Sequence, residues 1–331
     1  MTKTISIHFN IVFRLAVVLF VASFICSCEK EELPVPAHTP GNVITNSVTM
    51  RADYRYQLFF DLGTNTMVSQ NNKTDWDLGF ESSTSGDKII LNSSKMMFVA
   101  LTNQSNFNTV LDTIGLTFKW DAISGDLDST AIGNWKNHNN IYVVDRGLDS
   151  QGAHLGFKKI SFQSVNSNAY EIRFANLDGS DDVVRSVVKA DTYNFMFLSL
   201  DNVDVIVEPE KNNWDLVFTQ YTHVFQGNPP IPYLVTGVLI NRNNVEILNI
   251  SDKDFENITI EDINEYTFYS TINQIGYNWK EYVFSTGSYT IFSDKNYIIK
   301  STEGKYYKLH FIDFYDSTGI KGTPTFEFQE L

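Results

Sequence analysis

The sequence contains very little cysteine. Only two of its 331 residues are cysteines, and both lie near the N-terminus, at Cys26 and Cys28. The chain after Cys28 therefore has no disulfide, no thiolate metal site and no cysteine nucleophile. Its stability must come from the burial of apolar side chains.

A long apolar run is also absent. The only candidate, residues 15–22, is too short for a comfortable membrane span. It follows Lys3 and Arg14, and the segment ends in I-C-S-C at 25–28, which resembles a bacterial lipoprotein signal peptide. We therefore expect residues 1–27 to be removed and Cys28 to be the lipidated first residue.

The residues that follow Cys28 are acidic. E-K-E-E at 29–32 resembles the surface-export signal of lipoproteins in the Bacteroidota, and its alternative interpretation is a solvated linker. We expect an outer-membrane, lipid-anchored protein that faces outward. Residues 28–50, with three prolines and a glycine, are predicted to be a flexible tether.

Positive charge is scarce as well. The chain has 25 Lys and Arg against 39 Asp and Glu, a formal net charge of −14, and loss of Lys3 and Arg14 with the signal peptide changes it to −16. Such a surface repels nucleic acid and anionic lipid. The charge therefore argues against either as the main partner.

Catalytic motifs are missing. The sequence has no G-x-S-x-G elbow, no H-E-x-x-H helix and no glycine-rich phosphate loop. Asp181 and Asp182 are adjacent in a turn and would point apart, and the turn lacks the ligand spacing of a calcium loop. We predict a binding protein without enzymatic activity.

Alternating apolar and polar residues dominate the remaining chain. The alternation is clear at 54–60, 170–174 and 307–311, and turn-forming residues separate such stretches. Only 251–264 could hold a short helical turn or two. The pattern predicts an all-β protein with mainly antiparallel sheets.

The motif W-D-L-x-F occurs twice, at 76–80 and 214–218, with its tryptophans 138 residues apart. We interpret the folded part as a tandem duplication of a roughly 140-residue unit, with repeats at 51–190 and 191–331 that form two lobes or one continuous domain. In a strand Trp, Leu and Phe would share one buried face, while the Asp would cap a turn or pair with a lysine. Three further landmarks recur in the same order: 56–60 with 193–197, 90–108 with 239–256, and 170–174 with 307–311.

Several of these stretches resemble the HmuY family: the lipoprotein start, 56–60 leading into 75–80, the segment 214–223, and the end from 305 to 327. The resemblance implies an all-β surface lipoprotein that binds haem or a related tetrapyrrole. It also implies transfer of the haem to a TonB-dependent outer-membrane receptor. Members of the family hold haem iron with paired axial histidines or methionines.

A haem site needs nitrogen or thioether donors on opposite sides of an apolar slot. His223 follows the second motif among aromatic residues, and His154 lies in a glycine-bearing loop, so both are candidate axial ligands. The aromatic pocket would consist of Tyr221, Phe225 and Tyr233. The remaining candidates are weaker: His138 in a polar loop, His310 as a solvent-facing strand residue, and Met67, Met96, Met97 and Met196.

Two functions remain open from the sequence. The protein is either a haem-scavenging carrier, or a surface adhesion or receptor-accessory module that binds a protein or glycan without haem. The segment 220–233, expected to be an aromatic loop stiffened by prolines, would serve either role. No metal other than haem iron is expected.

Overall fold

The structure is a computed structural model that describes residues 40–201 and 203–331. Its described elements are twenty β-strands and six short 3₁₀ helices, and every strand pair is antiparallel, which confirms the all-β prediction. In these residues no helix is long and apolar enough to cross a membrane. The predicted signal peptide, Cys28 and the tether up to residue 39 lie outside the described residues.

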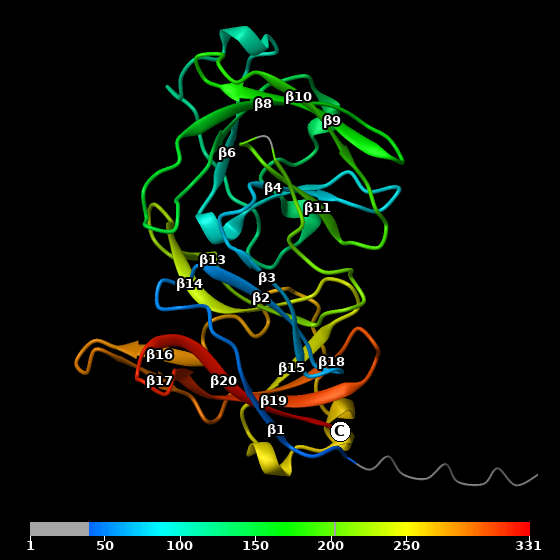
Figure 1. Ribbon diagram of the computed structural model, residues 1–331, viewed down its shortest axis with the longest axis vertical. Coiled ribbons are helices and arrows are strands. Elements are labelled where there is room, and N and C mark those ends of the chain that lie inside the picture. The colour runs from blue at the N-terminus through cyan, green and yellow to red at the C-terminus, as the bar shows by residue number, and fades with distance from the viewer. Residues whose placement is uncertain (1–39, 202) are drawn as a thin grey trace, which may run out of the picture. The chain divides into compact units, whose positions relative to one another are not determined.

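The strands form two lobes, each made of two sheets (Figure 1). In the first lobe the sheet orders are β12-β11-β4-β5 and β10-β9-β8-β7-β6. Its elements are β4 (Leu78–Glu81), β5 (Ile89–Leu91), η1 (Ser93–Lys95), β6 (Phe98–Leu101), η2 (Phe107–Thr109), η3 (Leu127–Ser129), η4 (Trp135–Asn137), β7 (Tyr142–Asp145), β8 (Phe157–Val165), β9 (Ala169–Asn176), β10 (Val183–Val188), β11 (Phe195–Ser199) and β12 (Val203–Val205).

The second lobe has the sheet orders β14-β13-β2-β3 and β1-β20-β19-β18-β15, and a separate hairpin β16-β17. The predicted helical turns at 251–264 are the 3₁₀ helices η5 and η6. Its elements are β1 (Ile44–Ser47), β2 (Tyr56–Asp61), β3 (Thr66–Asn72), β13 (Leu216–Phe225), β14 (Ile231–Ile240), β15 (Glu246–Ile250), η5 (Phe255–Asn257), η6 (Ile260–Asn264), β16 (Lys280–Val283), β17 (Ser288–Ile291), β18 (Asn296–Lys300), β19 (Tyr306–Tyr315) and β20 (Lys321–Glu330).

The chain passes between the lobes in a reciprocal way. β1, β2 and β3 belong to the second lobe, although they precede every strand of the first. Conversely β10, β11 and β12 belong to the first lobe, and the strands from β13 onward return to the second. The first lobe thus combines β4–β9 with β10–β12, and the second combines β13–β20 with β1–β3, so the lobes do not coincide with the predicted repeats 51–190 and 191–331.

The two W-D motifs hold this exchange in place with matching hydrogen bonds. Asp77 N–H donates to the Leu198 carbonyl (2.9 Å), and Asp215 N–H donates to the Phe60 carbonyl (2.9 Å). Asn92 and Asn241 follow the motifs at equivalent places. Each side-chain amide donates to the carbonyl of its motif tryptophan, at 2.8 and 2.7 Å.

Two buried lysines, Lys159 and Lys308, join loops to sheets in a matching way. Lys159 on β8 is buried and donates to the Val110 and Leu177 carbonyls at 3.0 and 3.1 Å. Lys308 on β19 is buried in the same way and donates to the Phe255 and Ile258 carbonyls at 2.8 and 3.1 Å. β8 therefore corresponds to β19. The sequence match of 170–174 with 307–311 paired β9 with β19, one strand away from this correspondence. Alternation of apolar residues is common to all these strands and does not distinguish them.

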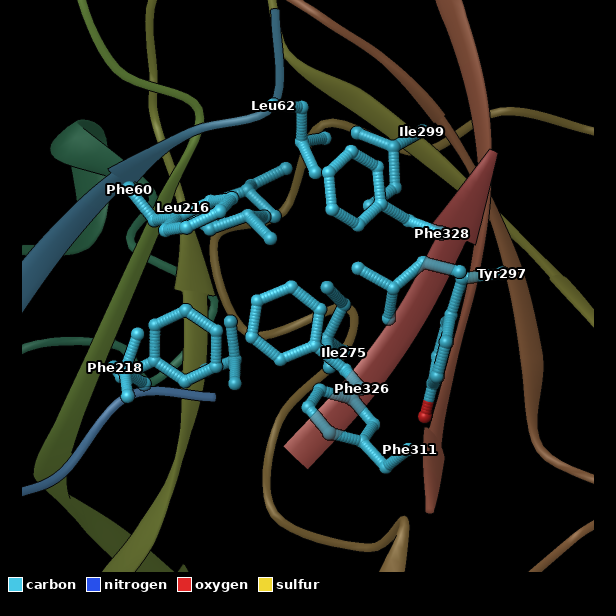
Figure 2. Packing of buried hydrophobic residues seen from close by; sticks show 14 of the residues in the cluster. Phe60, Leu62, Leu216, Phe218, Ile275, Tyr297, Ile299, Phe311, Phe326 and Phe328 are labelled. Atoms are coloured by element: carbon cyan, nitrogen blue, oxygen red, sulfur yellow. The ribbon is translucent and has the colours of Figure 1, made fainter. Parts of the chain in front are cut away.

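Each lobe encloses an apolar core between its two sheets. In the second lobe Phe60, Leu216 and Phe218 from one sheet face Phe326 and Phe328 from the other, as Figure 2 shows. The rings of Phe218 and Phe326 stack at 5.3 Å between centroids. The first lobe has an equivalent core that includes Leu78 and Phe80 of the first motif. They pack with Val99, Val144, Ile160, Tyr170, Ile172 and Phe174.

The motif tryptophans do not belong to these cores, which corrects the predicted shared face. Trp76 and Trp214 precede their strands and lie in a third cluster between the lobes. Trp76 packs edge-on against Phe197 at 4.7 Å, and Trp214 packs against Phe59 at 4.9 Å. The cluster therefore combines both motif tryptophans with residues of β2 in the second lobe and of β11 in the first lobe.

The predicted tether, 28–50, also needs a correction at its end. Ile44–Ser47 forms β1 and pairs with β20, from Ile44 opposite Phe328 to Ser47 opposite Thr325. Val48 and Met50 are buried in the second core. The ordered part thus begins before residue 50, because these apolar side chains complete a sheet edge and a core.

Candidate functional site

The segment 220–233 is mainly a hairpin, whereas the sequence favoured a loop. β13 extends to Phe225 and pairs with β14 over ten positions, with His223 opposite Tyr233. Around the turn at 226–230 the apolar residues are exposed: Phe225 by 38%, Ile231 by 55% and Tyr233 by 61%. The hairpin end is therefore an apolar surface in contact with solvent.

His223 lies in an aromatic cluster near this end. Its ring packs edge-on against Phe225 (4.7 Å) and Tyr277 (5.0 Å). Its Nδ1 is buried and has no hydrogen-bond partner among the described residues. Burial lowers the pKa of His223 below its usual value, so the imidazole is neutral at neutral pH. A neutral, unpaired imidazole is in the state that a metal ligand requires.

The predicted aromatic pocket is only partly assembled. Phe225 and Tyr233 lie near each other, with ring centroids 6.3 Å apart. Tyr221 is buried and lines a cavity between the lobes, so it is part of the interior and not of the exposed hairpin end. Tyr277 takes its place beside His223. No spacing in the sequence selects Tyr277, because it lies in an irregular segment far along the chain from His223.

An open groove of about 400 Å³ runs beside the hairpin end. Val224, Phe225 and Pro230 line one side, and Trp120 with Ile123 lines the other. Its volume falls in the usual range of roughly 300–1,000 Å³ for ligand pockets. The groove therefore has room for part of a flat apolar ligand, whose remainder would stay exposed.

His154 occupies a different environment. It is exposed, its Nε2 lies 2.7 Å from Oδ1 of Asp145, and its ring packs edge-on against Phe157. These neighbours belong to the first lobe, whereas those of His223 belong to the second. The two candidate ligands share no contact residue, so the structure does not bring them together as a facing pair.

The weaker candidates have structural partners. The His310 ring stacks on Phe255 at 4.0 Å and its Nε2 lies 3.0 Å from Glu327, so the predicted solvent-facing position was wrong. His138 is half-buried and contacts the Tyr142 hydroxyl at 3.3 Å. Among the described residues no group of three or more His, Cys, Asp or Glu is placed to hold a metal ion.

Comparison with known proteins identifies the family. The HmuY protein family matches residues 53–328, which is most of the chain. The chain belongs to the HmuY family. This confirms the resemblance found in the sequence, and a search of curated proteins gives no match.

Three solved structures of HmuY-type proteins overlap this chain with low scores. Apo PinO from Porphyromonas gingivitis is 10% identical, covers 88% of this chain and 97% of its own, and has a TM-score of 0.34. The Tannerella forsythia apo HmuY analog is 10% identical over 88% and 98%, with a TM-score of 0.25. A putative HmuY-like haem-binding protein from Bacteroides vulgatus is 13% identical over 86% and 90%, with a TM-score of 0.23. Scores this low carry no argument about the site.

Proposed function

We propose that this HmuY-family protein binds haem or a related tetrapyrrole at the end of the β13–β14 hairpin, with His223 as an iron ligand. The observation that carries the proposal is the state of His223: neutral, without a hydrogen-bond partner at Nδ1, and enclosed by aromatic rings. Its neighbour Phe225 also lines the open groove. A porphyrin lying in this groove would contact apolar side chains on its face, and its charged edge would remain in water.

A bound haem would supply an iron centre that accepts nitrogen ligands, and His223 with the aromatic residues beside it would hold the haem. His154 remains a second candidate ligand, and its Asp145 partner is of the kind that orients a metal-binding imidazole. No covalent chemistry is needed for a carrier of this type. Transfer to a TonB-dependent receptor would begin from the exposed side of the haem.

The test is a haem titration of residues 29–331, followed by absorption spectra under oxidising and reducing conditions. We expect saturable binding with a sharp, shifted Soret band. His223→Ala should weaken binding and change the band, and His154→Ala should do the same only if His154 is the second ligand. An unchanged spectrum and affinity for His223→Ala would remove His223 from the site.

Absence of any saturable change would favour the alternative role as an adhesion or receptor-accessory module. The exposed Ile231 and Tyr233 would then be the contact residues to replace. The proposed location at the outer membrane depends on Cys28. Radiolabelled palmitate should be incorporated into the full chain but not into its Cys28→Ala variant.

A further inference from the structure

A separate cavity of about 140 Å³ lies where the two lobes meet. Its apolar wall is the third cluster, with Trp76 and Phe197 contributed around the first motif and Trp214 and Phe59 around the second. The volume is close to that of an engineered apolar cavity of roughly 150 Å³ that binds benzene, and it is below that of a drug-sized pocket. The cavity is therefore too small for a porphyrin and suits a ligand with one ring or one branched chain.

The lining of the cavity also contains charged residues, Asp121, Glu208 and Arg242. Glu208 is buried and accepts a hydrogen bond from the Phe195 N–H at 2.8 Å. Asp121 accepts the N–H groups of Leu91 (2.7 Å) and Ala131 (2.8 Å), one on each carboxylate oxygen. Burial raises the pKa of Glu208 to about 7 and that of Asp121 to about 6. Both carboxyl groups are thus held in a place that disfavours their charge.

Arg242 faces the same cavity. Its Nη1 donates to the Gly125 carbonyl, and its guanidinium lies over the Phe195 ring at 5.6 Å. In residues 40–201 and 203–331 it forms no ion pair with Glu208 or Asp121 within 4.0 Å. Charges of both signs therefore line one small space without an ion pair between them, and the hydrogen bonds that hold them come from uncharged groups. Such an arrangement is unfavourable unless something else pairs with them.

We infer that this cavity binds a small zwitterionic amino acid whose apolar side chain is branched or aromatic. The carboxylate of the ligand would contact Arg242, and its ammonium group would contact Glu208 and Asp121. The side chain would lie between Trp76 and Trp214. A ligand with only a negative charge would give Glu208 and Asp121 no oppositely charged partner. A ligand with only a positive charge would give Arg242 none.

The access route is the segment 120–126. Trp120, Ala122 and Ile123 line both this cavity and the open groove beside the hairpin, so the segment separates the two. Its first half is fixed by the two hydrogen bonds that Asp121 accepts from Leu91 and Ala131. Its second half is held by the Ser124 carbonyl, which accepts the Ile272 N–H at 2.9 Å, and by the bond from Arg242 to Gly125. Displacement of residues 122–126 would open the cavity without separating the lobes and would leave Asp121 in place.

The experiment needs no variant. Residues 40–331 form one compact unit that contains every described sheet, so this unit is titrated by calorimetry with L-leucine and L-phenylalanine. Parallel titrations use isoamylamine, which lacks the carboxylate, and 4-methylpentanoate, which lacks the amine. We expect saturable binding of at least one amino acid and binding weaker by about tenfold or more for both analogues. No saturable binding of either amino acid, or an analogue that binds as tightly, would overturn the inference.

Variants then locate the site. Arg242→Gln and Glu208→Gln should each weaken amino acid binding by about tenfold or more. Arg173→Gln is the matched control, because Arg173 pairs with Asp182 on the outer side of the first lobe. Val217→Phe fills the apolar wall and keeps all charges, so it should abolish binding while the protein still melts cooperatively. Wild-type affinity in a folded Val217→Phe protein would show that the ligand binds elsewhere.

Discussion

The backbone N–H of Leu200 donates a hydrogen bond of 2.7 Å to Oδ2 of Asp77, which lies 123 residues earlier in the chain. The backbone N–H of Leu62 donates in the same way to Oδ2 of Asp215, at 3.0 Å. Each aspartate of the repeated motif thus holds the chain at the end of a strand from the other half. These two carboxylates fix the exchange of strands between the lobes.

The two aspartates differ in their other partners, and this gives a matched pair of variants. Asp77 is fully buried and pairs with Lys95 (2.5 Å) and Arg146 (2.9 Å), whereas Asp215 accepts only N–H and O–H groups, including Thr302 N–H at 2.8 Å. Asp77→Asn leaves the buried Lys95 without its ion-pair partner and leaves Arg146 with Asp201 alone, so it should cost about 3–5 kcal/mol of unfolding free energy.

Asp215→Asn should cost less, about 1–3 kcal/mol, because it disturbs neutral donors only. Urea unfolding of both variants at neutral pH measures the difference. Equal losses would show that the cations beside Asp77 contribute nothing to its role.

The buried lysines give a second prediction. Lys159→Met removes the donor of two hydrogen bonds and leaves the Val110 and Leu177 carbonyls without it, which should lower the unfolding free energy by about 1–3 kcal/mol. Lys308→Met should have a similar effect through Phe255 and Ile258. Lys305→Met, on an exposed turn, serves as the control. A neutral effect at both buried positions would contradict the prediction.

The third prediction concerns pH. Burial raises the pKa of Glu208 from 4.5 to about 7, and the neighbouring charges are Arg242 and Asp121. Because the folded pKa is the higher one, the favourable contribution of this group is full below pH 4.5, declines between 4.5 and 7, and is lost above 7. Glu208→Gln should therefore gain stability relative to the wild type as the pH rises, by up to about 3 kcal/mol.

Urea unfolding at pH 5 and pH 8 measures this gain. Glu281→Gln, on an exposed position of β16, should show no such change between the two pH values. The difference in unfolding free energy between the wild type and Glu208→Gln is the quantity compared. If it is the same at pH 5 and pH 8, Glu208 is ionised in the folded protein at both pH values.

The fourth prediction concerns His223. Burial lowers its pKa from the ordinary value of 6.5, so the ring stays neutral to a lower pH than a solvated histidine. Haem affinity should therefore be constant from pH 8 to pH 6.5 and fall only below that, when protonation competes with iron. Titrations of haem at several pH values measure it. A fall centred at or above pH 6.5 would assign the ligand to another group.

Much of the fold could be predicted because it depends on local patterns. Alternation identified strands near 56–60 and 307–311. The repeated W-D-L-x-F motif identified two places where the structure has matching hydrogen bonds, from Asp77 to Leu198 and from Asp215 to Phe60. The family could also be predicted from these stretches. The exchange of strands could not, since the pattern of a strand does not specify which partner it pairs with.

The site was harder to predict for the same reason. His223 was selected because it follows the motif among aromatic residues, but its contact with Tyr277 depends on tertiary packing. Gln57 shows a further limit. It accepts the Trp76 indole N–H at 2.9 Å, whereas the Trp214 indole N–H has no partner among the described residues. The bonds from Asp77 to Leu198 and from Asp215 to Phe60 align Gln57 with Phe195, one residue away from the match of 56–60 with 193–197 that the sequence suggested.

The pairing of β1 with β20 has a mechanical consequence for a chain held by its N-terminal end. Tension applied there would reach Ile44–Ser47 first and act on the last strand of the protein, Lys321–Glu330. The next strands in line, β2 and β3, are also part of the second lobe. A pulling force would therefore disrupt the second lobe first, and the first lobe, formed by the middle of the chain, would resist longest.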